Sequence, residues 1–155
     1  MSKILVCYFS ATGATKRLGE KIAGLLQADT FEIVPVVKYT TDDLKWPSRT
    51  NRSMQEMKNK NFRPLVQNKL KNPEDYNTLV IGFPIWYNTA PTIVNSFIEE
   101  NDLHGKKVYV FVTSGATGVD KSFKDLKKTY PNLYFISGKQ FNGSFHKKEV
   151  LEWVK

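Results

Sequence analysis

The sequence predicts a single α/β domain, a doubly wound sandwich in which helices cover both faces of a five-stranded parallel sheet. Short, continuous apolar runs alternate with segments of helical periodicity along the chain, and this alternation is typical of parallel α/β folds. The chain has 155 residues, which is long enough to bury one core, and it contains no internal repeat. We therefore expect residues 1–155 to form one domain.

Five apolar segments are expected to be the strands. They are rich in Val, Ile, Phe and Tyr, which favours strands over helices, and their continuous apolarity indicates that both faces of the sheet are covered. In chain order they span residues 3–8, 30–36, 78–83, 107–113 and 132–136.

Three stripes of apolar residues at helical spacing lie between these strands. The stripes are Leu18, Ile22, Leu25 and Leu26; then Ile93, Val94, Phe97 and Ile98; and then Phe123, Leu126 and Tyr130. Pro91 suits the first turn of the second helix, and Pro131 ends the third. A short last helix is expected over residues 147–153.

The connecting segment between the second and third strands is the least regular part of the chain. We expect a crossover helix within residues 49–61, flanked by loops at Trp46-Pro47 and Arg63-Pro64. Residues 38–71 contain nine Lys and Arg against three acidic residues, and so hold six of the eight excess positive charges. This basic segment is either a solvated face or a docking face for an acidic protein or an anionic ligand.

Composition limits the classes of protein that remain. No apolar run approaches the roughly 18 residues of a membrane-spanning helix, and the first residues lack the apolar region and cleavage site of a signal peptide. The single cysteine, Cys7, cannot form an internal disulfide, and we interpret it as a small buried hydrophobe. We expect a cytoplasmic protein with no membrane insertion and no nucleic-acid partner, because no nucleic-acid-binding motif is present.

The loop after the first strand has the features of a phosphate site. It consists of Ser10, Ala11, Thr12, Gly13, Ala14 and Thr15, and it leads into a helix, whose first turn presents unpaired N–H groups and the positive end of a dipole. A helix cap would explain one of its three hydroxyls. Three hydroxyls around a glycine favour a phosphate.

The classes of enzyme that transfer phosphoryl groups do not match this loop. The spacing G-x-x-x-x-G-K-[ST] is absent, and so is G-x-G-x-x-G. A receiver domain would have acidic residues where the first and third strands end at Phe9-Ser10 and Phe83-Pro84. A small cysteine phosphatase is excluded because Cys7 lies inside the strand and Gly13 stands six residues later. The loop therefore predicts a phosphorylated cofactor, with no catalytic side chain and no metal site.

The loop after the third strand contains two adjacent large rings. Its residues are Pro84, Ile85, Trp86, Tyr87 and Asn88. Rings in a strand-end loop are exposed unless something covers them, and a flat aromatic ligand would stack on them. The alternative is a ring folded onto its own helix. Asn88 tolerates a positive φ, which would allow a tight turn.

The loop after the fourth strand is small and polar. It consists of Thr113, Ser114, Gly115, Ala116, Thr117 and Gly118, and its backbone N–H groups could meet the edge of a heterocycle. Alone it is a weak signal. The carboxyl ends of parallel strands meet at one edge of the sheet, where ligands bind in this fold class, so the three loops are expected to form one site.

Together, S-A-T-G-A-T, P-I-W-Y-N and T-S-G-A-T-G resemble the corresponding loops of the flavodoxins, particularly those of the short-chain, flavodoxin-like FMN-binding family. The resemblance covers essentially the whole chain. It implies a flavodoxin-like three-layer sandwich with strand order 2-1-3-4-5, of which flavodoxin is the standard example. It also implies that FMN is the cofactor.

The resemblance assigns a part of FMN to each loop. Ser10–Thr15 would hold the phosphate without a cationic side chain, so that Lys16 and Arg17 face the solvent. Residues 84–88 would enclose the isoalloxazine, with Trp86 as the first choice for the stacked ring, and residues 113–118 would meet its pyrimidine side. A backbone carbonyl near Tyr87-Asn88 would accept a hydrogen bond from N5 of the reduced flavin, which would shift its potentials.

The function implied is that of a low-potential electron-transfer protein, which links a reductase to an electron acceptor. Well-known carriers of this family are acidic, whereas this chain has a net charge of +8, so its redox partners are expected to have acidic docking faces. Two alternatives stay open: an NAD(P)H-dependent FMN oxidoreductase that reduces quinones, and a flavodoxin-fold binding module without catalysis.

Overall fold

In the part of the chain that the structure describes, five parallel strands form one sheet in the order β2-β1-β3-β4-β5. The strands are β1 (Ile4–Tyr8), β2 (Asp29–Glu32), β3 (Thr78–Phe83), β4 (Lys107–Val112) and β5 (Tyr134–Gln140). The structure is a computed structural model, and it describes residues 3–40, 44, 52–87, 89–113, 118–141 and 145–154. The predicted fold class and strand order are confirmed.

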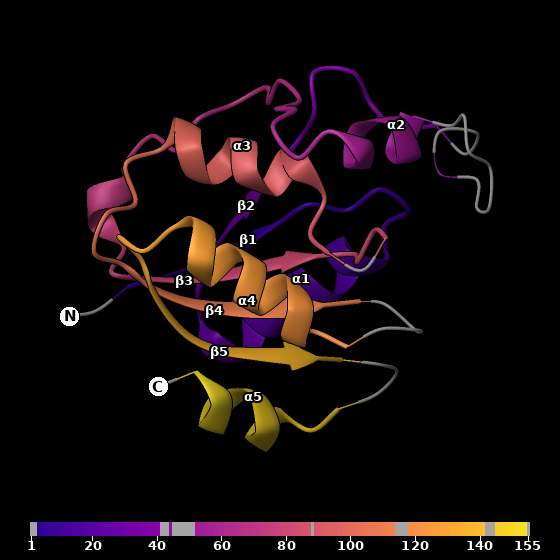
Figure 1. The fold of residues 1–155 in the computed structure, drawn as a ribbon. Coiled ribbons are helices and arrows are strands. Elements are labelled where there is room, and N and C mark those ends of the chain that lie inside the picture. Colours follow the sequence, from indigo (N-terminus) through magenta and orange to yellow (C-terminus); the bar gives the residue numbers. More distant parts are fainter. Residues whose placement is uncertain are drawn as a thin grey trace.

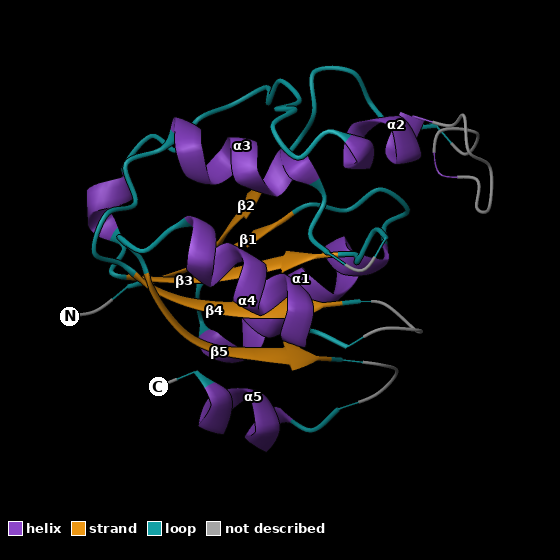
Figure 2. Ribbon diagram, in the orientation of Figure 1, coloured by secondary structure: helices purple, strands orange, loops and turns teal. Residues whose placement is uncertain are grey.

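Helices cover both faces of this sheet (Figures 1 and 2). The described helices are α1 (Ala14–Leu26), α2 (Arg52–Lys58), α3 (Thr92–Glu100), α4 (Asp120–Thr129) and α5 (Lys147–Trp153), together with a short 3₁₀ turn, η2 (Pro73–Asp75). Figure 1 shows α3 and α4 on one face and α1 and α5 on the other. The three apolar stripes and the short last helix of the prediction are confirmed.

The core is divided by the sheet into two layers. Alternate residues of a strand point to opposite faces, so Leu5 and Cys7 pack beneath α3 and α4, whereas Val6 and Tyr8 pack beneath α1 and α5. Burial raises the pKa of the Cys7 thiol. This cysteine is fully buried in the core, as interpreted from the sequence.

The second strand is shorter than predicted, because the expected strand 30–36 leaves the sheet after Glu32. Pro35 instead forms an antiparallel bridge with Val66, and the N–H of Val36 donates to the carbonyl of Leu65 at 2.9 Å. Proline has no N–H to give to a sheet ladder. The apolar run therefore continues outside the sheet, where Val36 is 51% exposed.

The fifth strand begins and ends later than the predicted range 132–136. Its pairing with β4 shifts register between Val108 and Tyr109, and it continues to Gln140, which lies opposite Val112. Its second half is polar because β5 is an edge strand of the sheet, where polar residues are common. Apolar periodicity could not detect this half.

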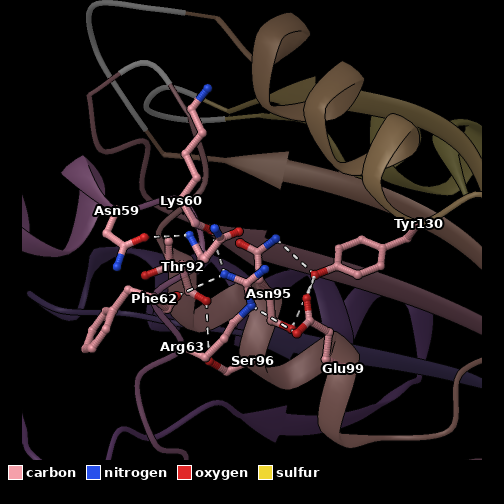
Figure 3. Close-up of polar contacts among 10 residues, drawn as sticks. Asn59, Lys60, Phe62, Arg63, Thr92, Asn95, Ser96, Glu99 and Tyr130 are labelled. Atoms are coloured by element: carbon pink, nitrogen blue, oxygen red, sulfur yellow. Dashed lines mark hydrogen bonds and ion pairs between the residues drawn. The ribbon is translucent and has the colours of Figure 1, made fainter.

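The crossover helix α2 lies within the predicted range 49–61, whereas the predicted loop at Trp46-Pro47 lies outside the described residues. The loop at Arg63 is bound to the helical layer (Figure 3). Arg63 Nε donates to Glu99 Oε1 of α3 at 3.0 Å, and its Nη1 donates to the carbonyl of Lys60 at 2.7 Å. The hydroxyl of Tyr130 also donates to Glu99. These bonds fasten the connecting segment to α3 and α4.

This cluster predicts a pH-dependent contribution to stability. The hydrogen bond from Arg63 holds the pKa of Glu99 below its ordinary value of 4.5 despite some desolvation. Since the folded-state pKa is the lower one, the stabilisation is present above the unfolded-state pKa and is lost as the pH falls through the folded-state pKa. We expect Glu99→Gln to cost at most about 1 kcal/mol at neutral pH, because the pair is exposed.

This effect is measured by urea unfolding of the wild type and the Glu99→Gln variant. The two proteins are compared at neutral pH and at a pH below the ordinary pKa of glutamate. The difference in unfolding free energy should shrink in acid. Glu152→Gln is the matched control, because Glu152 Oε1 lies 3.8 Å from Lys148 Nζ in an exposed ion pair of α5. This substitution should change the free energy of unfolding little at either pH. A Glu99→Gln difference that is the same at both values would contradict the prediction.

Candidate functional site

The loops that follow β1, β3 and β4 meet at the carboxyl edge of the sheet. The hydroxyls of Thr15 and Thr113 are hydrogen-bonded at 2.7 Å, which joins the first loop to the third. The rings of Phe9, which directly precedes the first loop, and Trp86 of the second loop pack together with their centroids 5.5 Å apart. The structure therefore brings the three predicted loops together. Of the predicted site residues, Asn88 and residues 114–117 lie outside the described residues.

The first turn of α1 points unpaired amides at this junction. Gly13 is the N-cap residue with φ +98°, a conformation that glycine adopts at little cost. The N–H of Arg17 donates to the Gly13 carbonyl at 3.0 Å, so the amides that precede it have no partner within the helix. Among the described residues no side chain caps this end, and its first turn contains no acidic residue.

The three hydroxyls of the first loop have different surroundings. Ser10 Oγ accepts the N–H of Gly13 at 3.0 Å and so shapes the loop. Thr15 is buried and bonded to Thr113, whereas Thr12 is exposed. Lys16 is also exposed and forms an ion pair with Glu32 at 3.3 Å. Lys16 and Arg17 are both exposed, as expected, but the guanidinium of Arg17 also lies beside the loop, because a Cβ at Gly13 would be 3.1 Å from its Nη1. The positive end of the helix dipole also favours an anion here.

The second loop makes a tight turn, with the positive φ at Tyr87, whereas Asn88, for which the sequence allowed one, lies outside the described residues. The N–H of Trp86 donates to the carbonyl of Thr89 at 2.9 Å, and the N–H of Thr89 donates back at 3.1 Å. Tyr87, inside the turn, has φ +48°. For a residue other than glycine this conformation costs about 1–2 kcal/mol, and such strain is concentrated at functional sites.

The ring of Trp86 is held by two edge-on contacts. Its centroid lies 5.5 Å from that of Phe9, at an interplanar angle of 85°, and 5.0 Å from that of Tyr39, at 77°. The neighbouring Tyr87 places its hydroxyl 3.4 Å from Ser53 Oγ of α2. Tyr87 therefore reaches the crossover helix rather than the helix that follows its own loop.

Next to Trp86, the side chains of Tyr39, Arg52 and Glu56 form a polar cluster that the sequence did not identify. Tyr39 is the member that contacts the Trp86 ring. The Tyr39 hydroxyl donates to Glu56 of α2, which is 6% exposed. Arg52 Nε pairs with the same carboxylate at 2.8 Å, and its guanidinium lies 3.8 Å from the Tyr39 ring centroid. One indication of this cluster was present in the sequence, the i,i+4 spacing of Arg52 and Glu56, which favours an ion pair on a helix. It did not indicate that Glu56 is buried, because that burial depends on tertiary packing.

The substitution Tyr39→Phe tests whether this polar cluster positions Trp86. The substitution keeps the ring but removes a donor to a buried carboxylate, which costs about 1–3 kcal/mol. We expect a lower melting temperature of the flavin-free protein and a several-fold loss of flavin affinity. Tyr134→Phe is the control, because Tyr134 is 64% exposed on the edge strand β5. Flavin affinity equal to that of wild type would contradict the positioning role.

A further contact ties the second loop to α4. Thr89 Oγ1 donates to Asp125 Oδ2 at 2.7 Å, and Lys121 Nζ approaches the same oxygen at 2.8 Å. Burial raises the pKa of Asp125, but these two hydrogen bonds outweigh it, and the net shift is downward. Asp125 thus stays ionised and keeps Thr89 at the end of the turn.

The described residues fit a phosphorylated flat heterocycle. The uncapped, acid-free start of α1 suits a phosphate dianion, and the Trp86-Tyr87 turn provides a seat for a ring. Among the residues that the structure describes, no group of three His, Cys, Asp or Glu side chains could hold a metal ion. No described helix is long and apolar enough to cross a membrane.

Comparisons with known proteins agree with this geometry. A family model described as Flavodoxin matches residues 3–155. A candidate flavoprotein from Bacteroides eggerthii is 42% identical, with a TM-score of 0.95 over 99% of this chain and 96% of that one. Another candidate, from Bacteroides uniformis, is 40% identical, with a TM-score of 0.92 over 99% and 97% of the two chains.

A more distant structure shows the same fold. The flavoprotein from Lactobacillus acidophilus, solved in complex with FMN, is 23% identical, with a TM-score of 0.77 over 100% of both chains. The comparison with curated proteins found no match.

Proposed function

This chain belongs to the flavodoxin family, and a flavoprotein of the same fold was solved in complex with FMN. From that premise we propose that the chain binds FMN and is a low-potential carrier of electrons between redox proteins. The observation that supports FMN best is the junction of two features at one edge of the sheet. These are the uncapped start of α1 and the Trp86-Tyr87 turn. Bound FMN would supply the redox chemistry, and the protein would hold and tune it.

Each loop has a part in holding the cofactor. The amides at the start of α1, together with the hydroxyls of Ser10 and Thr12, would bind the phosphate. Trp86 would cover the ring system, and the backbone between Thr113 and Gly118 would meet its polar edge. The helix dipole would balance part of the negative charge of the phosphate. Lys16 is already paired with Glu32, whereas the Arg17 guanidinium lies beside Gly13.

The chemistry of these loops favours a carrier over an enzyme. None of the three loop sequences, 10–15, 84–88 and 113–118, contains a carboxylate, an imidazole or a thiol. A general acid or base within reach of a substrate is the usual requirement for proton-coupled chemistry. In these loops only the phenol of Tyr87 could serve as one, and its hydroxyl lies 3.4 Å from Ser53 Oγ of α2. Such loops suit the exchange of electrons with another protein.

The basic connecting segment adjoins this site. It holds six of the eight excess charges, and its helix α2 touches the second loop through Ser53 and Tyr87. We infer that the redox partners present acidic faces, since opposite charges accelerate association. Electron transfer to such a partner should slow as salt is added.

Anaerobic reduction of the FMN-loaded protein tests the proposal. We expect slow bleaching of the flavin by NADPH alone and fast bleaching when a catalytic amount of an NADPH-dependent flavoprotein reductase is added. Fast bleaching by NADPH alone, followed by turnover of a quinone, would identify an oxidoreductase instead. Purified protein that is colourless and does not bind added FMN would identify a binding module.

A further inference from the structure

A cavity of about 490 Å³ lies beside the edge strand β2, apart from the three loops. It lies between the first half of β1, the middle of β2 and residues 67–72, which lead into η2. In Figure 1, η2 lies at the end of the sheet opposite to α2. None of the lining residues belongs to the proposed FMN site. The volume falls within the usual range of small-molecule sites.

The walls of this cavity combine an apolar surface with unpaired positive charge. The apolar surface is contributed mainly by the partly exposed Phe31, Leu70 and Tyr76, because Leu5 at the base of the cavity is only 2% exposed. Lys69 and Lys71 also line the cavity, and no acidic residue does. Within the described ranges of the chain, neither lysine forms an ion pair. An anion in the cavity would therefore meet two lysines that form no ion pair among the described residues.

Hydrogen bonds hold the wall of the cavity in place without a ligand. The N–H of Gln67 donates to the carbonyl of Val34 at 2.8 Å, at one end of the wall. The N–H of Leu70 donates to Oδ1 of Asn101, which follows α3, also at 2.8 Å. A preformed wall reduces the entropy lost when a ligand binds.

One carboxylate is hydrogen-bonded to this wall from outside the cavity. The hydroxyl of Tyr76 donates to Asp29 Oδ2 at 2.7 Å, and this hydrogen bond raises the pKa of Tyr76 to about 12. Tyr76 therefore stays protonated at neutral pH and keeps its bond to Asp29. Asp29 itself does not line the cavity.

The edge of β2 adds backbone groups to the site. In the described part of the sheet β2 pairs with β1 alone, so the N–H and C=O groups of its outer edge are not used by the ladder. Thr30 and Phe31 of this strand line the cavity. A ligand seated here would find polar backbone groups beside apolar side chains.

We propose that this cavity is a second binding site, for a small aromatic carboxylate. The flat body of such a ligand packs on Phe31, Leu70 and Tyr76, and its carboxylate lies at Lys69 and Lys71. The site is independent of FMN, because it shares no residue with the three loops.

A titration with 2-naphthoate, followed by the backbone amide signals of the ¹⁵N-labelled, FMN-loaded protein, tests this proposal. We expect saturable shifts at Thr30, Phe31 and Leu70. The double variant Lys69→Ser, Lys71→Ser should weaken binding about 3- to 20-fold, as expected for the loss of two exposed ion pairs. The variant Lys127→Ser, Lys128→Ser on exposed positions of α4 is the matched control and should bind like wild type.

Two further measurements make the result decisive. The neutral analogue 2-naphthalenemethanol should bind the wild type more weakly than naphthoate does. Both variants should keep the wild-type circular dichroism spectrum, because all four lysines are exposed. Shifts confined to the flavin loops, no shifts at millimolar naphthoate, or equal affinity of the Lys69/Lys71 variant would overturn the proposal. An acidic peptide that binds this edge where naphthoate does not would also overturn it.

Discussion

Replacing Thr12 by Asp is expected to weaken FMN binding by about 5- to 1,000-fold, because a carboxylate within about 4 Å of a phosphate costs about 1–4 kcal/mol. Thr12 is exposed at the start of α1, so the fold should tolerate the change. Riboflavin has the same ring system without the phosphate and should lose little affinity. Quenching of flavin fluorescence on titration with protein measures both.

Thr12→Asn is the matched control for this experiment. Asparagine has the shape of aspartate without its charge, so FMN should bind to it nearly as it does to the wild type. An equal loss of FMN and riboflavin in Thr12→Asp would show that the loop does not hold the phosphate.

Replacing Trp86 by Ala is expected to weaken FMN and riboflavin alike, by about 10- to 100-fold each. Stacking contributes about 0.5–1.5 kcal/mol beyond the area buried, and the turn also loses the edge contacts of Trp86 with Phe9 and Tyr39. The ratio of the two flavin affinities should stay that of the wild type, because the start of α1 is untouched. The same fluorescence titration measures this ratio.

Two tryptophan variants separate stacking from general loss of packing. Trp86→Phe keeps an aromatic face and should retain most of the affinity. Trp153→Phe alters a ring that packs on Tyr109 and Phe141, in the other layer of the core, so flavin binding should not change. Full flavin affinity in Trp86→Ala would contradict the assignment of Trp86 as the ring seat.

Most of the fold could be predicted because the buried strands of a doubly wound sheet are continuous apolar runs. The bounds of β3 follow this rule, whereas β2 and β5 do not. The apolar run of β2 continues past Pro35 into an antiparallel bridge, and β5 continues into the polar residues up to Gln140. In the edge strands of the sheet, the apolar residues and the paired residues are not the same set. Composition alone therefore cannot locate the ends of these strands.

The three loops of the candidate site were singled out by their residue types, but the contacts among them could not be predicted. The bond between Thr15 and Thr113 joins residues 98 positions apart, and the burial of Glu56 beside Tyr39 depends on how α2 packs. Gly82 is a further example, because a Cβ there would lie 1.9 Å from Cζ of Phe111. Such close packing is set by the assembled sheet, and local sequence carries no sign of it.

The central claim is that the start of α1 is the phosphate end of an FMN site. Calorimetric titration of the flavin-free wild type with FMN and with riboflavin tests it most directly. Two or more charge-assisted hydrogen bonds to the phosphate, at about 1.5–3 kcal/mol each, predict that FMN binds at least about 100-fold more tightly. Equal affinities for the two flavins, or no binding of FMN at all, would contradict the account.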